Sequence, residues 1–396
     1  MMAAITAARE GCQVTLYEKK PRIGQKILAT GNGKCNLSNR NTDYRNVYNS
    51  SKYKGIAETL HKFTADDTIN FFSDIGVLIR EKNGYLYPYS EQAQTVLEAF
   101  RLELSRLDVE VICENEIETI EQKEDFFLVS DEKYDKVIIA CGSKAGVKEG
   151  HGDSGYKIAE MMGHTLKEVV PGLTKLFCEE EELLKILAGV RCQAEVTMIT
   201  DGAEFQFERG ELQFTKNALS GIPIFQMSRE VAYDLTKGKE VLIRINFFPD
   251  KTAYEFQAIC DQRLNRVGET KSVMDFLLGL ANNKVNQAII KTNDMKQNDD
   301  IIAYRKTKLK KLLKSYRDFR FTVLRPDSFE NAQVCAGGVL LSELSENLES
   351  LKVPGIYFAG EILDVDGMCG GFNLQWAWTT GYVAGKSAAE AGEIDD

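Results

Sequence analysis

The sequence lacks the features that mark several classes of protein. No apolar run approaches the length of a membrane span, and no basic stretch followed by an apolar segment directs export at the N-terminus. The nine cysteines are scattered without a C-x-x-C pair, and the three histidines share no metal-binding spacing. These absences predict a cytoplasmic protein with reduced thiols, no membrane partner and no bound metal.

The charged residues are mostly acidic. A formal net charge of −10 argues against nucleic acid as a partner. A basic segment, residues 305–314, could contact an anionic partner, but its leucine spacing favours a solvated helix face. The 396 residues suit two or three globular domains, and nothing in the sequence indicates an oligomeric state.

The first eighteen residues predict half of a dinucleotide-binding unit. Residues 1–11 read as a helix closed by glycine, and residues 12–18 as a buried strand that ends in Glu18. A carboxylate at this place binds ribose hydroxyls in βαβ units. The other half, a strand and a G-x-G-x-x-G turn, is expected immediately upstream of Met1. Residues 150–155 spell the same pattern without a strand directly before them, so we predict only a turn there.

Two further segments are rich in glycine and polar residues. Residues 31–36 contain two glycines, a lysine and two asparagines, which would let the backbone approach a ligand closely. Residues 360–375 follow a buried strand and open a helix through Gly370 and Gly371. A helix N-terminus presents backbone N–H groups that suit an electron-rich ring edge, and the acid Glu361 suits sugar-like hydroxyls.

Three segments resemble one family. Residues 18–36 look like the opening of the BaiN/YhiN-type bacterial flavoproteins, also called aminoacetone-oxidase-family FAD-binding enzymes or NAD(P)/FAD-dependent oxidoreductases. Residues 214–223 are similar to the family's F-T-x-x-G-x-S-G-P segment, and residues 360–375 to its G-E-x-x-D-V-x-G-x-x-G-G-Y-N-L-Q ending. This chain departs from the family at Phe372, where Tyr is usual, and at residues 140–144, which replace A-T-G-G.

The resemblance implies an α/β fold with a Rossmann-like, glutathione-reductase-like FAD-binding domain. An inserted β-barrel-like and helical part would interrupt that domain. The expected boundaries are residues 1–188 for the first part of the FAD-binding domain, 189–250 and 319–335 for the inserted β domain, 251–318 for the inserted helical domain, and 336–396 for the second part of the FAD-binding domain.

The resemblance also implies where FAD binds. Glu18 would hold the adenosine ribose, Ile117 would meet the adenine, and Glu361 would lie near the ribityl-pyrophosphate region. The full set of expected cofactor-binding residues is Glu18, Lys19, Lys26, Thr30, Gly31, Gly33, Ile117, Ala140, Gly142, Gly360, Glu361, Asp364, Gly370, Gly371, Phe372, Asn373 and Leu374. Lys34 and Asn36 are the candidate catalytic residues near the flavin face.

The implied reaction is hydride transfer. NAD(P)H would be the transient reductant, and the acceptor would be an organic small molecule with an activated C=C bond, such as a steroid-like enone. Two alternatives stay open, a flavin-dependent amine oxidase that uses oxygen and a flavin-binding protein that is inactive in this form. An RNA-modifying partner protein is a further alternative, supported only by the basic segment at 305–314.

Overall fold

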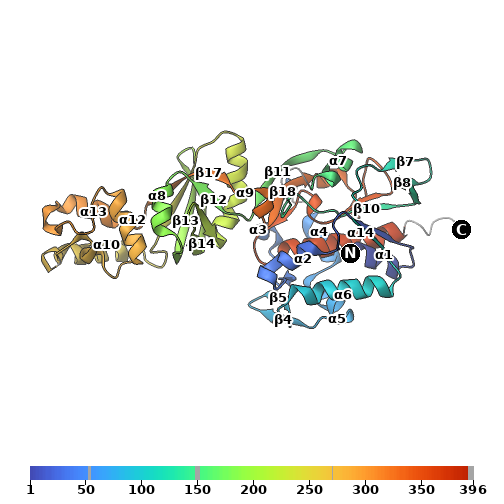
Figure 1. Ribbon diagram of the computed structural model, residues 1–396, viewed down its shortest axis with the longest axis horizontal. Helices are drawn as coiled ribbons and strands as arrows, with labels where there is room; N and C mark the ends of the chain where they lie inside the picture. The colour runs from blue at the N-terminus through green and yellow to red at the C-terminus, as the bar shows by residue number, and fades with distance from the viewer. Residues whose placement is uncertain (52–54, 148–151, 270, 391–396) are drawn as a thin grey trace. The chain divides into compact units, whose positions relative to one another are not determined.

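The computed structural model describes residues 1–51, 55–147, 152–269 and 271–390. The chain forms two compact units (Figure 1). Unit 1 contains Met1–Val170 and Phe329–Asp396, and unit 2 contains Pro171–Ser328. Unit 2 is therefore inserted into the sequence of unit 1.

Unit 1 contains two pairs of parallel strands. β1 (Thr15–Glu18) pairs with β6 (Glu110–Cys113), and β10 (Val137–Ile139) pairs with β19 (Ile356–Phe358). Among the described residues these pairs form two separate sheets. Parallel strands need crossover connections, and here the partners come from distant parts of the sequence.

Helices α1 (Met2–Arg9) and α14 (Phe372–Glu390) pack closely against each other. Small residues explain the close approach. A Cβ added to Gly385 would lie 2.5 Å from the carbonyl oxygen of Ala3, and one added to Gly381 would lie 3.0 Å from the Cβ of Met2. The N-terminal helix is thus held against the C-terminal helix that carries the predicted flavin motif.

Short antiparallel sheets and further helices complete unit 1. Its other elements are α2 (Gln25–Ala29), β2 (Ser38–Asn39), α3 (Tyr44–Val47), β3 (Tyr48–Asn49), α4 (Ile56–Lys62), α5 (Ala65–Asp74), β4 (Ile79–Lys82), β5 (Tyr85–Pro88), α6 (Ala93–Arg106), β7 (Glu121–Gln122), β8 (Phe127–Val129), β9 (Glu132–Tyr134), α7 (Ser154–Met161), β18 (Val334–Val339) and β20 (Asp366–Gly367), with β11 (Leu166–Gly172) ending at the start of unit 2. Of the G-x-G-x-x-G pattern at residues 150–155, Gly150 and His151 lie outside the described residues, and α7 begins just after Asp153.

Unit 2 is built on a closed antiparallel barrel. Its strands, in barrel order, are β12 (Leu176–Cys178), β15 (Ala218–Gly221), β14 (Ala203–Phe214), β13 (Arg191–Thr200), β16 (Val241–Asn246) and β17 (Phe319–Pro326). Successive side chains of a strand point to opposite faces, and every second residue of β16 faces the barrel core. Val241, Ile243 and Ile245 are buried, while the residues between them are more exposed. α9 (Ile222–Thr236) packs against β14 and its neighbours.

Five helices accompany the barrel at one end. α8 (Glu181–Leu187) packs against α12 (Asn283–Thr292), and α10 (Ala253–Asn265) packs against α13 (Lys306–Lys314), with α11 (Val273–Leu277) beside α12 (Figure 1). The sequence sets the start of α10: Thr252 accepts a hydrogen bond from the Glu255 N–H, and the Glu255 carboxylate accepts one from the Thr252 N–H.

The structural division differs from the expected boundaries at both ends of the insertion. Residues 171–188 were expected in the first part of the FAD-binding domain, but they belong to unit 2 because β12 pairs with β15 and β17. Residues 329–335 were expected in the β domain, but they belong to unit 1, where β18 begins. The helices of residues 251–318 fall in the same compact unit as the barrel.

Candidate functional site

Left-handed backbone shapes the loop at residues 30–36. Gly31, Asn32 and Gly33 have φ values of 56°, 53° and 82°. The turn lets the Cys35 N–H donate to the Thr30 carbonyl at 3.1 Å, and a Cβ added to Gly31 would lie 2.9 Å from the Asn36 nitrogen. Glycine is therefore required at 31 by both its φ and its close neighbour.

The segment after this loop lies against the start of α14. The side-chain amide of Asn39 donates to the Gly370 carbonyl at 2.9 Å. A Cβ added to Gly371, whose φ is 93°, would lie 2.7 Å from the Ser38 carbonyl oxygen and 2.8 Å from Asn36 Oδ1. The two glycine-containing segments singled out in the sequence thus meet at the N-terminus of α14.

Asn36 leaves an unused acceptor at this junction. Its Oδ1 is buried and has no hydrogen-bond partner among the described residues. A buried polar atom without a partner costs free energy, about 1–3 kcal/mol, unless a ligand or water satisfies it. The first N–H groups of an α-helix also lack partners within the helix. An acceptor and helix N–H donors therefore lie close together.

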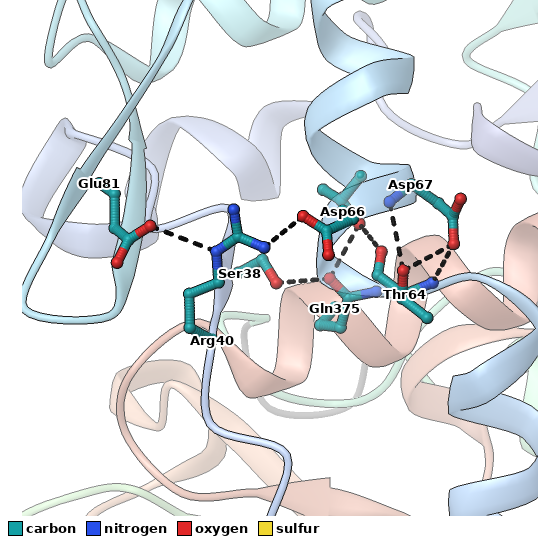
Figure 2. Close-up of polar contacts among 8 residues, drawn as sticks. Ser38, Arg40, Thr64, Asp66, Asp67, Glu81 and Gln375 are labelled. Carbon is teal, nitrogen blue, oxygen red and sulfur yellow. Dashed lines mark hydrogen bonds and ion pairs between the residues drawn. The ribbon is translucent and has the colours of Figure 1, made fainter.

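Gln375 holds this junction in place (Figure 2). Its Oε1 accepts hydrogen bonds from the hydroxyls of Ser38 and Thr68, and its Nε2 donates to the Phe63 carbonyl and to Thr379 Oγ1, both at 3.0 Å. The side chain is buried, and its bonds tie α14 to Ser38 of β2, to Thr68 of α5 and to Phe63 just before α5.

An ion-pair network in the same view supports the chain just after β2. Arg40 bridges Asp66 at the start of α5 and Glu81 of β4 (Figure 2). Thr64 caps α5 by accepting from the Asp67 N–H at 3.3 Å, and the Asp67 carboxylate accepts from the Thr64 N–H at 2.8 Å. These contacts fix α5, which carries Thr68.

Glu361 lies in a 3₁₀ turn, Gly360–Ile362, just after β19, and makes two contacts. Its carboxylate pairs with the Lys26 amine, and its other oxygen accepts from the Cys335 N–H at 3.0 Å. The structure therefore brings together two expected cofactor-binding residues, Lys26 and Glu361, that lie far apart in the sequence. The Glu361 side chain is mostly buried, with 16% of it exposed, and these two partners hold its carboxylate.

Asn373 and Asp364 are engaged with the protein itself. The Asn373 amide clamps Gly367, accepting from its N–H at 2.8 Å and donating to its carbonyl at 2.7 Å. Asp364 is buried and accepts from the Ser51 N–H at 2.8 Å, with the Lys167 amine at 3.8 Å. Their side chains shape the loop before α14, which contains the paired glycines.

The expected adenosine-side residues lie at the end of β1. The Glu18 carboxylate accepts from the Lys20 N–H at 3.0 Å, and Lys19 pairs with Glu116 at 3.4 Å. Ile117 is half-buried. Gly142 has a φ of 76° and follows the exposed Ala140 and Cys141 after β10. Among the described residues, no hydrogen bond or ion pair joins these side chains to the junction at α14.

Lys34 points away from the junction. It is exposed and its amine pairs with Glu91 at 2.7 Å, while Arg80 pairs with the same carboxylate at 3.0 Å. Thr30 donates to the Ile27 carbonyl at 2.6 Å. Of the two candidate catalytic residues, Asn36 therefore lies at the glycine junction and Lys34 lies in a surface ion pair.

The cysteines near these segments are poor nucleophiles. Burial raises the pKa of Cys369 to about 12 and that of Cys35 to about 11. Burial likewise raises the pKa of Cys335 to about 12. A thiol with such a pKa stays protonated near neutral pH. In the described part of the chain no group of His, Cys, Asp or Glu side chains is arranged to hold a metal ion, and no helix is long and apolar enough to cross a bilayer.

Sequence reasoning missed the residues that position the site. Gln375 lies within the C-terminal motif, and Ser38 and Asn39 follow the glycine loop at 31–36 directly, but the motifs gave none of them a role. A buried glutamine in an otherwise apolar helix turn was a usable signal, because such a side chain needs hydrogen-bond partners from elsewhere. Which segments would supply them could not be read from the sequence.

The chain matches known proteins over nearly its whole length. Residues 1–387 match the family described as HI0933-like protein Rossmann domain. The chain is 37% identical to the 3-dehydro-bile acid delta(4,6)-reductase of Clostridium scindens, over 98% of this chain and 96% of that protein. It is 26% identical to a ribosomal RNA dihydrouridine synthase of Haemophilus influenzae, over 98% of this chain and 95% of that protein.

A solved structure shares the fold. The 3-ketosteroid delta1-dehydrogenase from Sterolibacterium denitrificans, in complex with 1,4-androstadiene-3,17-dione, is similar with a TM-score of 0.51 at 11% identity, over 98% of this chain and 97% of that chain. At this identity the likeness concerns the fold alone. With the family match and the closed barrel, it confirms the predicted fold class, a Rossmann-like FAD-binding domain with an inserted barrel and helices.

Proposed function

Because the chain belongs to the HI0933-like Rossmann-domain family, the family that its motifs predicted, we propose that it is an FAD-dependent reductase of conjugated C=C bonds. The observation that carries the proposal is the buried, unpartnered Asn36 oxygen beside Gly371 at the N-terminus of α14. Bound FAD would supply hydride-transfer chemistry, with NAD(P)H as the proposed reductant.

The residues at the junction fit a flavin. Asn36 Oδ1 can accept a hydrogen bond from a ring N–H, and the N-terminus of α14 can donate to ring oxygens and stabilise negative charge on the ring. Gly371 leaves room that a side chain would fill. Glu361, held by Lys26 and the Cys335 N–H, suits the hydroxyls of a ribityl chain. The remaining expected cofactor-binding residues keep their proposed roles along the nucleotide.

The relatives support the kind of acceptor. A 3-dehydro-bile acid delta(4,6)-reductase acts, by its name, on double bonds next to a ring ketone. A dihydrouridine synthase saturates the uracil ring, whose C=C bond is also conjugated to a carbonyl. In either kind of substrate the conjugated carbonyl activates the far carbon of the C=C bond towards hydride. We therefore propose an enone-like small molecule as substrate, and a uracil ring in RNA as the second candidate.

The experiment begins with the visible spectrum of the purified protein. Anaerobic NADH or NADPH should bleach the flavin bands, and a 3-oxo steroid with conjugated double bonds should restore them while its mass rises by two hydrogens. Restoration by uridine-containing RNA, with dihydrouridine detected in the digested nucleosides, would instead select the second candidate. A flavin that only amines reduce and only oxygen reoxidises would refute both in favour of an amine oxidase.

A matched pair of variants tests the site. Asn36→Leu removes the unpartnered acceptor and should lower the flavin content of the purified protein. Asn265→Leu makes the same change at an exposed position in unit 2 and should retain wild-type flavin content. Equal flavin content in the two variants would contradict the assignment of Asn36.

A further inference from the structure

The charge of the chain is strongly segregated. Residues 251–318, here called the helical lobe, contain fourteen Lys or Arg and eight Asp or Glu residues, which gives the lobe a charge of +6. The whole chain carries −10, so the other residues together carry −16. A local charge opposite to that of the rest of a protein marks an interaction surface for a charged partner. The net charge of the chain conceals this lobe.

The positive charge of the lobe is concentrated on α13. Lys306, Lys310 and Lys314 are spaced four residues apart and lie in one row on the helix, with Lys311 beside them. All four are exposed. The opposite side of the helix consists of the buried residues Leu309, Leu312 and Leu313. The lysine row is therefore oriented outward by the packing of the leucines.

The lysine row is not neutralised by nearby acids. None of its four amines forms an ion pair with a carboxylate in the part of the chain that the structure describes. The neighbouring carboxylates have other partners, since Asp299 accepts from the Tyr304 hydroxyl and Asp318 pairs with Arg320 at 2.6 Å. Arg305, just before the helix, is exposed as well. The row is thus available to an external anion.

We propose that the lysine row of α13 docks the phosphodiester backbone of an RNA. A straight row of cations along about two helical turns matches a linear polyanion, whereas a small anion needs groups that converge on one point. A membrane surface fits less well, because an interfacial helix inserts an apolar face and the leucines of α13 are already buried in the lobe. The exposed Tyr254, at the start of α10, adds an aromatic ring on the same lobe on which a base could stack.

The binding has a calculable salt dependence. Each phosphate contact to a single strand contributes about −0.7 to the slope of log K against log salt, so four lysines contribute about −3. A fourfold rise in salt, from about 50 to about 200 mM, should then weaken binding by about 50-fold through these contacts alone.

The experiment measures fluorescence anisotropy of a fluorescein-labelled, single-stranded RNA of mixed sequence against the full-length protein. A variant with Lys306, Lys310, Lys311 and Lys314 all changed to Gln should lose most of the salt slope, about 3, and bind the RNA at least tenfold more weakly at low salt. Glutamine keeps the helix propensity of lysine, and circular dichroism checks the fold.

The control changes the same amount of charge elsewhere. Lys82, Lys123, Lys133 and Lys237 are exposed and lie outside the lobe, and changing all four to Gln should leave the salt slope within about one unit of wild type. Equal losses in both variants would mean a general charge effect and would overturn the proposal. Tight binding of anionic phosphatidylserine vesicles through the row, with no RNA binding, would overturn it too.

This proposal does not depend on the flavin chemistry. Reduction of a small enone by the four-glutamine variant should equal that of the wild type, because no lysine of the row is among the proposed flavin contacts. Loss of RNA binding with retained enone reduction therefore supports the docking surface, and loss of flavin reduction in the wild type would count only against the proposed function.

Discussion

Replacing Gln375 by leucine tests whether its hydrogen bonds hold the glycine junction. Leucine has nearly the same size but neither a donor nor an acceptor, so the partners must find others or remain unpaired. Thr68 can donate to the Thr64 carbonyl at 3.0 Å, and Thr379 still donates to the Phe63 carbonyl at 2.6 Å. Ser38 is fully buried, and its hydroxyl has no acceptor other than Gln375 among the described residues.

The expected cost therefore comes from one buried hydroxyl. An unsatisfied buried hydroxyl costs about 1–3 kcal/mol, which we expect as the loss in the free energy of unfolding of Gln375→Leu. For a domain of this size each kcal/mol lowers the melting temperature by about 2–4 °C. The flavin content should fall as well, because Ser38 lies two residues after Asn36 and its carbonyl lies beside Gly371.

A double variant tests whether the unpaired Ser38 hydroxyl is the cause of the lost stability. Adding Ser38→Ala to Gln375→Leu removes the unpaired hydroxyl, so urea unfolding followed by circular dichroism should show part of the stability restored. Gln94→Leu, at an exposed position of α6, is the matched control and should change stability by less than about 0.5 kcal/mol. A double variant that is less stable than Gln375→Leu would refute the reasoning.

Three further outcomes are expected. Gly371→Ala should lose flavin and about 1–3 kcal/mol of stability, because its φ is strained for alanine and the new Cβ would clash with the Ser38 carbonyl. Gly76→Ala is the control, since its φ of 88° is similar but no atom lies near the added Cβ, and it should retain flavin. Lys34→Gln should lower turnover less than Asn36→Leu in steady-state assays, and a larger loss would favour Lys34 over Asn36 as the catalytic residue. Hydrogen bonds from Arg106 and Arg9 hold the pKa of Glu103 at about 2. The stability that this pairing contributes is present above about pH 4.5 and should be lost as the pH falls towards 2. Urea unfolding of Glu103→Gln at several pH values should lack that loss.

Local patterns were sufficient for the elements that carry the motifs. The helix at the N-terminus, the strand that ends in Glu18 and the helix after Gly371 lie where the sequence predicts them, because short-range spacing and glycine positions determine such elements. The boundaries of the insertion were less predictable. Residues 176–178 look like any short apolar strand, and only pairing with β15 and β17 places them in the barrel.

The sequence by itself determined the family, the fold class and the two segments rich in glycine, since these depend on residue identity and order along the chain. Only the tertiary structure decided which side chains meet. It placed Asn36 against Gly371, paired Lys26 with Glu361, and turned Lys34 towards Glu91. These contacts join residues separated by up to several hundred positions, and packing rather than local pattern selects them.

For charge too, the sequence settles one part and the tertiary structure another. The count of acids and bases predicted an acidic protein without a nucleic-acid partner, and the spacing of leucines predicted that α13 has a solvated face. The spacing within α13 aligns Lys306, Lys310, Lys311 and Lys314, and the burial of its leucines turns that side of the helix outward. Among the described residues none of these four lysines pairs with a carboxylate. Net charge is a sum over the chain, whereas a partner meets one surface, and only the fold determines which charges share it.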